Sequence, residues 1–392
     1  MQLLTTEQVA ERLGVKPATV YAYVSRGLLP SRRNAAGKGS LFAKADVDAL
    51  IAGRRRVTPN IRTGITLIRD GGLYYRGHDA TELARTRTYE AVAGLIWTGE
   101  PDPAPFPVHP ALRELAERVG APLPGSARLT DRLRVTVAAV AAADPLRFDT
   151  TPAAVLATGR TLIATMVAAL PRRSRAADPS GPASLAALLW PRLTEQPMSE
   201  HGLRALDAAL ILLADHDIAA STLAARVAAS TRAHPYAVIS AGLAALDGPL
   251  HGAASEHVHP LLAAAVAGAD PIEVISERLR AGGGIPGFGH PLYPSGDPRA
   301  RTLFELLGDH PAGEAARRLA GVVRTRSGIL PNIDLALAAL TLRFDMPADA
   351  GEAVFAVART AGWLAHALEE YANRPARFRP TGQYSGRDPA AQ

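Results

Sequence analysis

The sequence contains no cysteine, which excludes disulfide bonds, a thiol nucleophile and thiolate metal ligands. No apolar run approaches the roughly 18 residues that a membrane-spanning helix needs. Residues 1–7 also lack the basic start and the apolar stretch of a signal peptide. We therefore expect a chain with no membrane segment and a cytoplasmic location.

Lysine is also scarce, because the 392-residue chain has three lysines and all of them lie before residue 57. Residues 1–56 hold ten basic and four acidic side chains, a surplus of six that equals the net charge of the whole chain. Such a break in composition marks a domain boundary. We expect a domain at 1–56, a linker at 57–61 and a body at 62–392, whose hydrophobic content is ample for a large core.

Residues 1–56 have the pattern of a small winged helix-turn-helix domain. Thr5 and Gln8 are spaced as a capping box that opens a helix ending at Leu13. Pro17 suits the first position of a second helix, and Asp46 is expected to cap a last, short helix. The basic, glycine-containing stretch between the second and third helices is typical of a wing. The pattern resembles the excisionase and MerR-like DNA-binding domains.

In such domains the second helix enters the major groove of duplex DNA, and cations of the wing contact phosphates. The residues expected at the DNA are Lys16, Thr19, Tyr21, Arg32, Arg33 and Lys38. The alternative is an interaction or dimerisation module whose positive face is only a solvated surface. Charge alone does not decide between the two.

The body is predicted to be all-α. Leucines recur at helical spacing, as at 203, 206, 210 and 213, and glycine and proline clusters, as at 282–284, separate such segments. His257-Val258-His259 invites a metal interpretation, but no carboxylate or cysteine completes a ligand set at a usual spacing. We therefore expect no metal.

Two histidines and one carboxylate in the body suggest carbon-acid chemistry. His251 and His290 each follow or precede glycine, and Asp334 stands in Pro331-Asn332-Ile333-Asp334. Removing a proton beside a thioester carbonyl requires a base and a donor to the developing enolate oxygen, roles that suit Asp334 and His251. An α-keto dicarboxylic acid would need a second donor and a guanidinium clamp, which His290 and Arg299 can supply.

These segments, in this order, resemble the citrate synthase family. The resemblance extends to an early segment at 64–78, a loop with Asp215-His216-Asp217, and a tail at 379–386, so it covers most of the chain. It implies a large and a small mobile helical domain, the small one roughly at 255–345. It also implies an active homodimer that condenses acetyl-CoA, a co-substrate, with oxaloacetate and needs no cofactor.

The resemblance assigns a role to each matching residue. His251 would donate to the acetyl-CoA enol, His290 would protonate the oxaloacetate carbonyl, and Asp334 would remove the methyl proton. The thioester product would then be hydrolysed to citrate and CoA. The matches to the family's oxaloacetate-binding residues are His216, Arg299, Arg359 and Arg379, the last contributed by the neighbouring subunit.

Several alternatives stay open at this point. Asp334 or His216 could cap a helix, Arg359 and Arg379 could form surface ion pairs, and Arg324 and Arg326 are candidates for CoA phosphates. Propionyl-CoA could be the acyl donor and give 2-methylcitrate, since one methylene changes binding by only about 1–3 kcal/mol. The chain could also be a DNA-binding regulator whose synthase-like body senses an acyl-CoA or keto acid.

Overall fold

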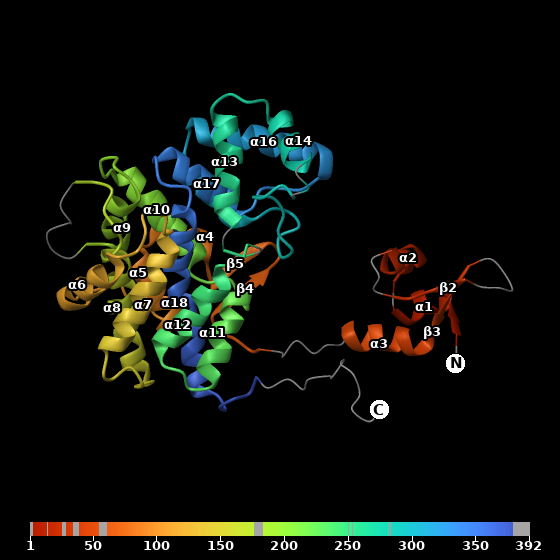
Figure 1. Ribbon diagram of the computed structural model, residues 1–392, viewed down its shortest axis with the longest axis horizontal. Helices are drawn as coiled ribbons and strands as arrows, with labels where there is room; N and C mark the ends of the chain where they lie inside the picture. Colours follow the sequence, from red (N-terminus) through yellow and green to blue (C-terminus); the bar gives the residue numbers. More distant parts are fainter. Residues whose placement is uncertain are drawn as a thin grey trace. The chain divides into compact units, whose positions relative to one another are not determined.

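The computed structural model describes residues 3–13, 15–25, 29–33, 39–54, 61–175, 183–249, 251, 252, 254–280, 282 and 284–378. The chain divides into two compact units, Met1–Arg62 and Thr63–Gln392. Among the described residues, no helix combines the length and the apolar character that a membrane crossing requires. The helix-rich architecture predicted from the sequence is confirmed, because in the described part of the chain strands form only two small sheets (Figure 1).

The described residues of the smaller unit form three helices and a three-stranded antiparallel sheet. Its elements are β1 (Leu3–Thr5), α1 (Thr6–Leu13), α2 (Pro17–Ser25), β2 (Arg32–Arg33), β3 (Ser40–Ala43) and α3 (Lys44–Arg54), with strand order β1-β3-β2. The predicted capping box is confirmed, since the Thr5 N–H donates to Gln8 Oε1 at 2.9 Å and the Gln8 N–H donates to Thr5 Oγ1 at 3.4 Å. The prediction that the second helix starts at Pro17 is also confirmed.

Two features of the smaller unit differ from the prediction. Asp46 does not cap a helix, because β3 runs directly into α3 and places Asp46 within the first turn. There the carboxylate favours the positive end of the helix without occupying the cap position. Strand β1 was not predicted, because three residues are too few to reveal a period of two; it pairs Leu4 with Phe42, and both are buried.

The larger unit begins with a short sheet and continues as helices. Its elements are β4 (Thr66–Arg69), β5 (Gly72–Tyr75), β6 (His78–Asp79), α4 (Ala80–Thr86), α5 (Tyr89–Thr98), α6 (Pro110–Gly120), α7 (Leu129–Ala143), α8 (Pro152–Ala168), α9 (Leu185–Leu193), α10 (Glu200–Leu213), α11 (Ala220–Ser230), α12 (Pro235–Leu246), α13 (Ala254–Val266), α14 (Pro271–Arg280), α15 (Pro298–Leu307), α16 (Pro311–Ser327), α17 (Ile333–Arg343) and α18 (Ala350–Ala372). The sheet has the order β4-β5-β6.

Helix α18 is the centre of the larger unit. It is buried along most of its 23 residues and packs against α8, α10, α11 and α12. Alanine and glycine allow these close approaches. At Gly242 of α12, an added Cβ would lie 2.5 Å from the Trp363 ring of α18, so a larger residue could not fit without movement.

The remaining helices are arranged so that several loops converge. In Figure 1, α13, α14, α16 and α17 gather at one end of the larger unit, beyond the end of α18. The loops that connect α10 to α11, α12 to α13, α14 to α15 and α16 to α17 each contribute residues to one pocket. The assignment of 255–345 to a separate mobile domain stays a prediction.

Candidate active site

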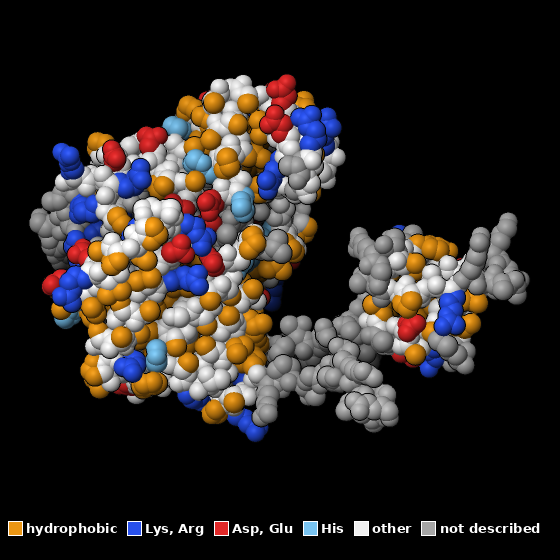
Figure 2. All heavy atoms as spheres, in the orientation of Figure 1, with side chains coloured by type: hydrophobic (Ala, Val, Ile, Leu, Met, Phe, Trp, Pro, Cys, Tyr) orange, Lys and Arg blue, Asp and Glu red, His pale blue; other side chains and the backbone are white. Residues whose placement is uncertain are grey.

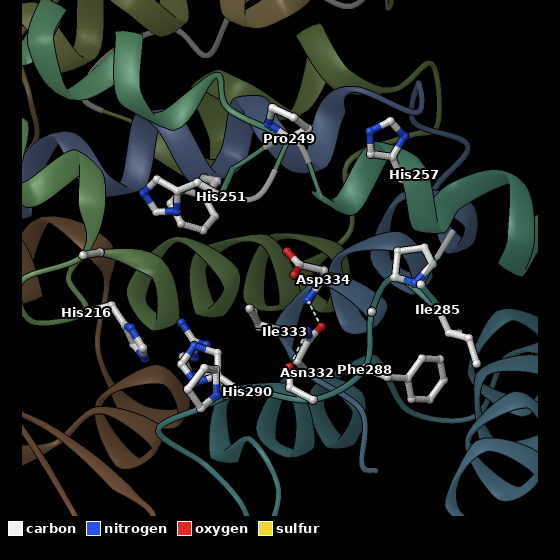
Figure 3. A pocket seen from close by; sticks show the side chains of 18 of the residues that line it. His216, Pro249, His251, His257, Ile285, Phe288, His290, Asn332, Ile333 and Asp334 are labelled. Atoms are coloured by element: carbon white, nitrogen blue, oxygen red, sulfur yellow. Dashed lines mark hydrogen bonds between the residues drawn. The ribbon is translucent and has the colours of Figure 1, made fainter. Parts of the chain in front are cut away.

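A pocket of about 480 Å³ brings together residues from distant parts of the sequence. Its lining includes six of the seven residues expected to act on substrate, which are His216, His251, His290, Arg299, Asp334 and Arg359. The seventh, Arg379, lies outside the described residues. In Figure 3, Asp334 lies between the loop that carries His251 and the loop that carries His290.

His251 lies in the loop between α12 and α13 and is held by Ser221 at the start of α11. The Ser221 N–H points at His251 Nε2 at 3.4 Å, and the Ser221 hydroxyl lies 2.7 Å from the same nitrogen. Because a backbone N–H can only donate, Nε2 accepts, and the neutral ring carries its proton on Nδ1. Burial, with Arg359 nearby, lowers the pKa of His251 to about 4. At neutral pH this ring is therefore an uncharged donor.

His290 is also an uncharged donor, but through the other nitrogen. The Leu292 N–H donates to His290 Nδ1 at 3.2 Å, which leaves the proton of the neutral ring on Nε2. Burial lowers its pKa to about 4, and the charge of Arg299 adds to this effect. The ring meets that of His216 edge-on, with centroids 5.0 Å apart.

His216 is more deeply buried than the other two histidines. Its Nε2 lies 2.9 Å from the Tyr293 hydroxyl, and the two rings are in edge contact. Burial first, and then the charges of Arg299 and Arg359, hold its pKa well below the usual range. The idea that His216 caps a helix is wrong, since Ala219 is the N-cap residue of α11.

Asp334 is the carboxylate of the pocket, and it does not cap its helix. Asn332 is the N-cap of α17, and its Oδ1 accepts the Asp334 N–H at 3.0 Å. Burial raises the pKa of Asp334 to about 7, although Arg299 lowers it and Asp297 raises it further. A carboxylate with a pKa near neutrality can take up and return a proton under ordinary conditions.

The Arg299 guanidinium is paired with the carboxylate of Asp297, a residue for which the sequence indicates no role. Asp297 accepts from Arg299 Nε at 2.9 Å and Nη2 at 2.8 Å, and both residues are buried. Asp297 also accepts the Ile333 N–H at 3.1 Å. Asp297 therefore fixes the guanidinium and the start of the helix that carries Asp334.

Arg359 has an unsatisfied guanidinium edge. Its Nε donates to the Leu213 carbonyl at 2.8 Å, while Nη1 and Nη2 are buried and have no hydrogen-bond partner among the described residues. The guanidinium lies over the Phe355 ring, 4.6 Å from its centroid. The surface ion-pair interpretation is therefore wrong. A buried charge with two unpartnered Nη nitrogens in a pocket fits a carboxylate of a ligand.

The pocket lining contains one arginine, Arg278, that the sequence did not single out, and the roles of Arg324 and Arg326 at CoA stay predictions. Arg278 and His257 line the pocket, whereas Arg324 and Arg326 lie in the last turn of α16 and are not part of that lining. No sequence pattern marks Arg278 as a pocket residue. It reaches the pocket because of where α14 lies in the fold. Within the described part of the chain, no group of three His, Asp or Glu side chains could hold a metal ion.

The chain is mostly helical and has a polar pocket between its helices, and comparison with known proteins identifies its family. The family model described as "Citrate synthase, C-terminal domain" matches residues 55–381, and the one described as "Helix-turn-helix domain" matches residues 3–55. The chain belongs to the citrate synthase family. Citrate synthases use acetyl-CoA as a substrate and need no separate cofactor.

Relatives with two different names resemble this chain almost equally. A citrate synthase from Haloferax volcanii is 32% identical over 81% of this chain and 90% of that protein. A 2-methylcitrate synthase from Corynebacterium glutamicum is 31% identical over 81% of this chain and 89% of that protein. The crystal structure of citrate synthase from Thermotoga maritima superimposes with a TM-score of 0.66 at 27% identity, covering 84% of this chain and 94% of that chain.

Proposed function

We propose that the protein condenses an acyl-CoA with oxaloacetate, with acetyl-CoA as donor and citrate and CoA as products. The observation that carries this proposal is the Asp334 carboxylate, with its pKa raised to about 7, in one pocket with two uncharged histidine donors and an unpaired arginine. A base, two oxygen-stabilising donors and a carboxylate clamp are the groups that this condensation requires.

In this proposal each step of the reaction is carried out by a particular group. Arg359, with Arg299 and His216, binds the keto acid, and His290 Nε2–H polarises its carbonyl. Asp334 removes a proton from the acyl carbon beside the thioester, while His251 Nδ1–H donates to the enolate oxygen. The new carbon–carbon bond then forms as His290 gives its proton to the carbonyl oxygen. Hydrolysis of the thioester releases CoA.

The acyl donor is the least constrained part of the proposal. A relative named citrate synthase and a relative named 2-methylcitrate synthase match this chain at nearly the same sequence identity. A pocket distinguishes donors that differ by one methylene by only about 1–3 kcal/mol. Propionyl-CoA, giving 2-methylcitrate, is therefore the second candidate donor.

We also propose a homodimer in which Arg379 of one subunit reaches the site of the other. Figure 2 shows that apolar side chains predominate over the part of the larger unit where α7 and α12 lie in Figure 1. In the loop after α7, Leu146 is 76% exposed and Phe148 is 66% exposed. Uncovered apolar surface of this kind is typical of an interaction site, and a second copy is the occupant that the family resemblance favours.

The direct test is the release of free thiol. The purified protein mixed with oxaloacetate and acetyl-CoA is expected to release CoA, which a thiol reagent detects, and propionyl-CoA in a parallel reaction ranks the donors by kcat/KM. Omission of oxaloacetate is the control for simple thioester hydrolysis. Release from neither donor would contradict the synthase proposal and favour the regulator, which binds these ligands without turnover.

A second proposed function is binding of duplex DNA by the smaller unit. The match to a helix-turn-helix family at 3–55 supports it, as does the exposure of Lys16, Tyr21 and Arg32. Thr19 lies on the same helix as Tyr21. Lys38 and the side chain of Arg33 lie outside the described residues, so their roles stay predictions.

The DNA proposal predicts binding that weakens steeply with salt, because cations that neutralise phosphates release counterions. Gel-shift titration of the full-length protein against its own promoter region, at several salt concentrations, measures this slope. Lys16→Glu with Arg32→Glu should abolish the shift, whereas Arg118→Glu, an exposed charge reversal in the larger unit, should not. DNA binding that does not change with salt concentration, or that persists in the Lys16→Glu, Arg32→Glu variant, would contradict the DNA proposal and favour an interaction module.

A further inference from the structure

The loop at residues 214–219 carries His216 into the pocket, and its path is fixed around Asp215. The Asp215 carbonyl accepts from the Tyr75 hydroxyl at 3.0 Å, and the Gly362 N–H donates to the Ala214 carbonyl at 3.1 Å. Asp217, two residues on, has a left-handed backbone with φ of 53°, which non-glycine residues adopt at a cost. Contacts around Asp215 therefore have to hold this turn against relaxation.

The Asp215 side chain makes the strongest of these contacts. It is fully buried, Thr66 Oγ1 donates to its Oδ2 at 2.5 Å, and His366 Nε2 lies 3.3 Å from both carboxylate oxygens. Burial opposes its ionisation, yet His366, Arg359 and Thr66 lower its pKa on balance. A buried carboxylate is tolerated only with such partners.

His366, for which the sequence indicates no role, has a defined partner on each side. Arg226 Nη1 lies 2.5 Å from His366 Nδ1. Because a guanidinium only donates, Nδ1 accepts, and the ring proton resides on Nε2, facing Asp215. His366 therefore acts as a donor to Asp215 whose tautomer is set by Arg226.

Arg226 is itself held by two carboxylates of α18. Glu370 accepts from its Nε at 2.5 Å, and Glu369 accepts from its Nη1 at 2.7 Å. Glu369 also accepts the Gly64 N–H at 2.9 Å, just before β4, which carries Thr66. The donors to Asp215 thus belong to one hydrogen-bonded network between β4, α11 and α18.

We propose that Asp215, held by Thr66 and His366, is a positioning residue that sets His216 for binding of the keto acid. It touches no substrate and acts through the adjacent residue. This inference rests on the proposed function, because it assigns His216 to the keto acid. It adds to that function a buried network that the pocket lining does not reveal.

A competing role for Asp215 predicts the opposite sign. Arg359 is nearby, and Asp215 could serve only as its counter-ion. Removing a negative charge would then make the pocket more positive and strengthen binding of a dianion. If Asp215 positions His216, the same substitution weakens binding. The direction of the change in keto-acid affinity therefore separates the two roles.

The experiment measures oxaloacetate binding by calorimetry, together with the KM of each substrate, in full-length variants. Thr66→Val removes one donor to Asp215 at constant volume, and Asp215→Asn removes the charge. We expect each to raise the Kd and KM for oxaloacetate about tenfold or more, as loss of a hydrogen bond to a charged group does, and to leave the acyl-CoA KM within about twofold. The matched control is Thr165→Val, a buried threonine of α8 whose hydroxyl donates only within its helix, to Thr161.

The outcomes are distinguishable. Unchanged or tighter oxaloacetate binding in folded Thr66→Val and Asp215→Asn would overturn the positioning role. An equal rise in the KM of both substrates would also overturn it, since a general loss of packing in the active site would have that effect. Wild-type protein that binds oxaloacetate without releasing thiol would contradict the proposed function alone. The ratio of the oxaloacetate Kd of each variant to that of wild type would still decide the positioning role. Wild-type protein that binds no oxaloacetate would contradict both.

Discussion

Replacing Asp334 with Asn is expected to lower kcat by about a thousandfold, within the range that loss of a general base produces, while oxaloacetate affinity stays nearly unchanged. The amide preserves the shape of the side chain but cannot accept the acyl proton. The keto acid binds through Arg359, Arg299 and His216 before that proton moves, so its affinity does not depend on the base. Steady-state kinetics and calorimetry on the same preparation measure both quantities.

The control for this substitution is Asp207→Asn. Asp207 is a buried carboxylate whose pKa is also raised to about 7, mainly by burial, but it accepts the Tyr89 N–H and does not line the pocket. Its replacement should leave kcat within a few-fold of wild type. Equal losses of kcat in the two variants, or a large loss of oxaloacetate affinity in Asp334→Asn, would contradict the assignment of the base.

The wild-type pH profile provides an independent check on Asp334. Its pKa is raised to about 7, and a base acts only when ionised, so kcat should fall as pH decreases through about 7. The sign for stability is opposite. Folding favours the protonated form, so the contribution of Asp334 to stability decreases as pH rises from about 4 to about 7. Above pH 7, Asp334→Asn should therefore unfold at no lower temperature than wild type.

Much of the site could be predicted from the sequence because its residues lie in short segments, some of them glycine-containing, whose order along the chain is itself informative. Six of the seven residues expected at the substrate line one pocket. The capping box at Thr5 and Gln8 was predictable for a similar reason, since both its partners lie within one helical turn. Local patterns of this kind need no knowledge of tertiary structure.

The supporting contacts could not be predicted, because they join residues far apart in the chain. Ser221 is 30 residues from His251, and Tyr293 is 77 from His216. Asp297 is only two residues from its partner Arg299, but an aspartate before a proline at the start of a helix has an ordinary role as a cap. The structure shows that Asp297 caps α15 and clasps Arg299 at the same time.

Arg359→Lys is expected to raise the KM and Kd for oxaloacetate about a hundredfold, the effect of losing two hydrogen bonds to a charged group. Nη1 and Nη2 of Arg359, which lines the pocket, are buried with no hydrogen-bond partner among the described residues, and a lysine ammonium cannot bind a carboxylate through a planar fork. Arg359 is a cleaner target than Arg299, because removing Arg299 leaves the buried Asp297 carboxylate unpaired and disturbs the start of α17. Arg299→Ala should therefore also lower keto-acid affinity, but that result would not distinguish loss of a ligand contact from disturbance of Asp297 and α17.

The matched control is Arg192→Lys, another fully buried arginine, whose guanidinium donates to the carbonyls of Ala168 and Leu188. It does not line the pocket, so this substitution should lower the unfolding temperature without changing oxaloacetate affinity. Arg359→Lys should instead lower oxaloacetate affinity strongly and the unfolding temperature less than Arg192→Lys does. In the free protein Arg359 Nε donates to the Leu213 carbonyl, but Nη1 and Nη2 have no hydrogen-bond partner among the described residues and can pair with a bound carboxylate. Wild-type oxaloacetate affinity in folded Arg359→Lys would remove the carboxylate clamp from the proposed site and leave the free guanidinium edge of Arg359 without a function.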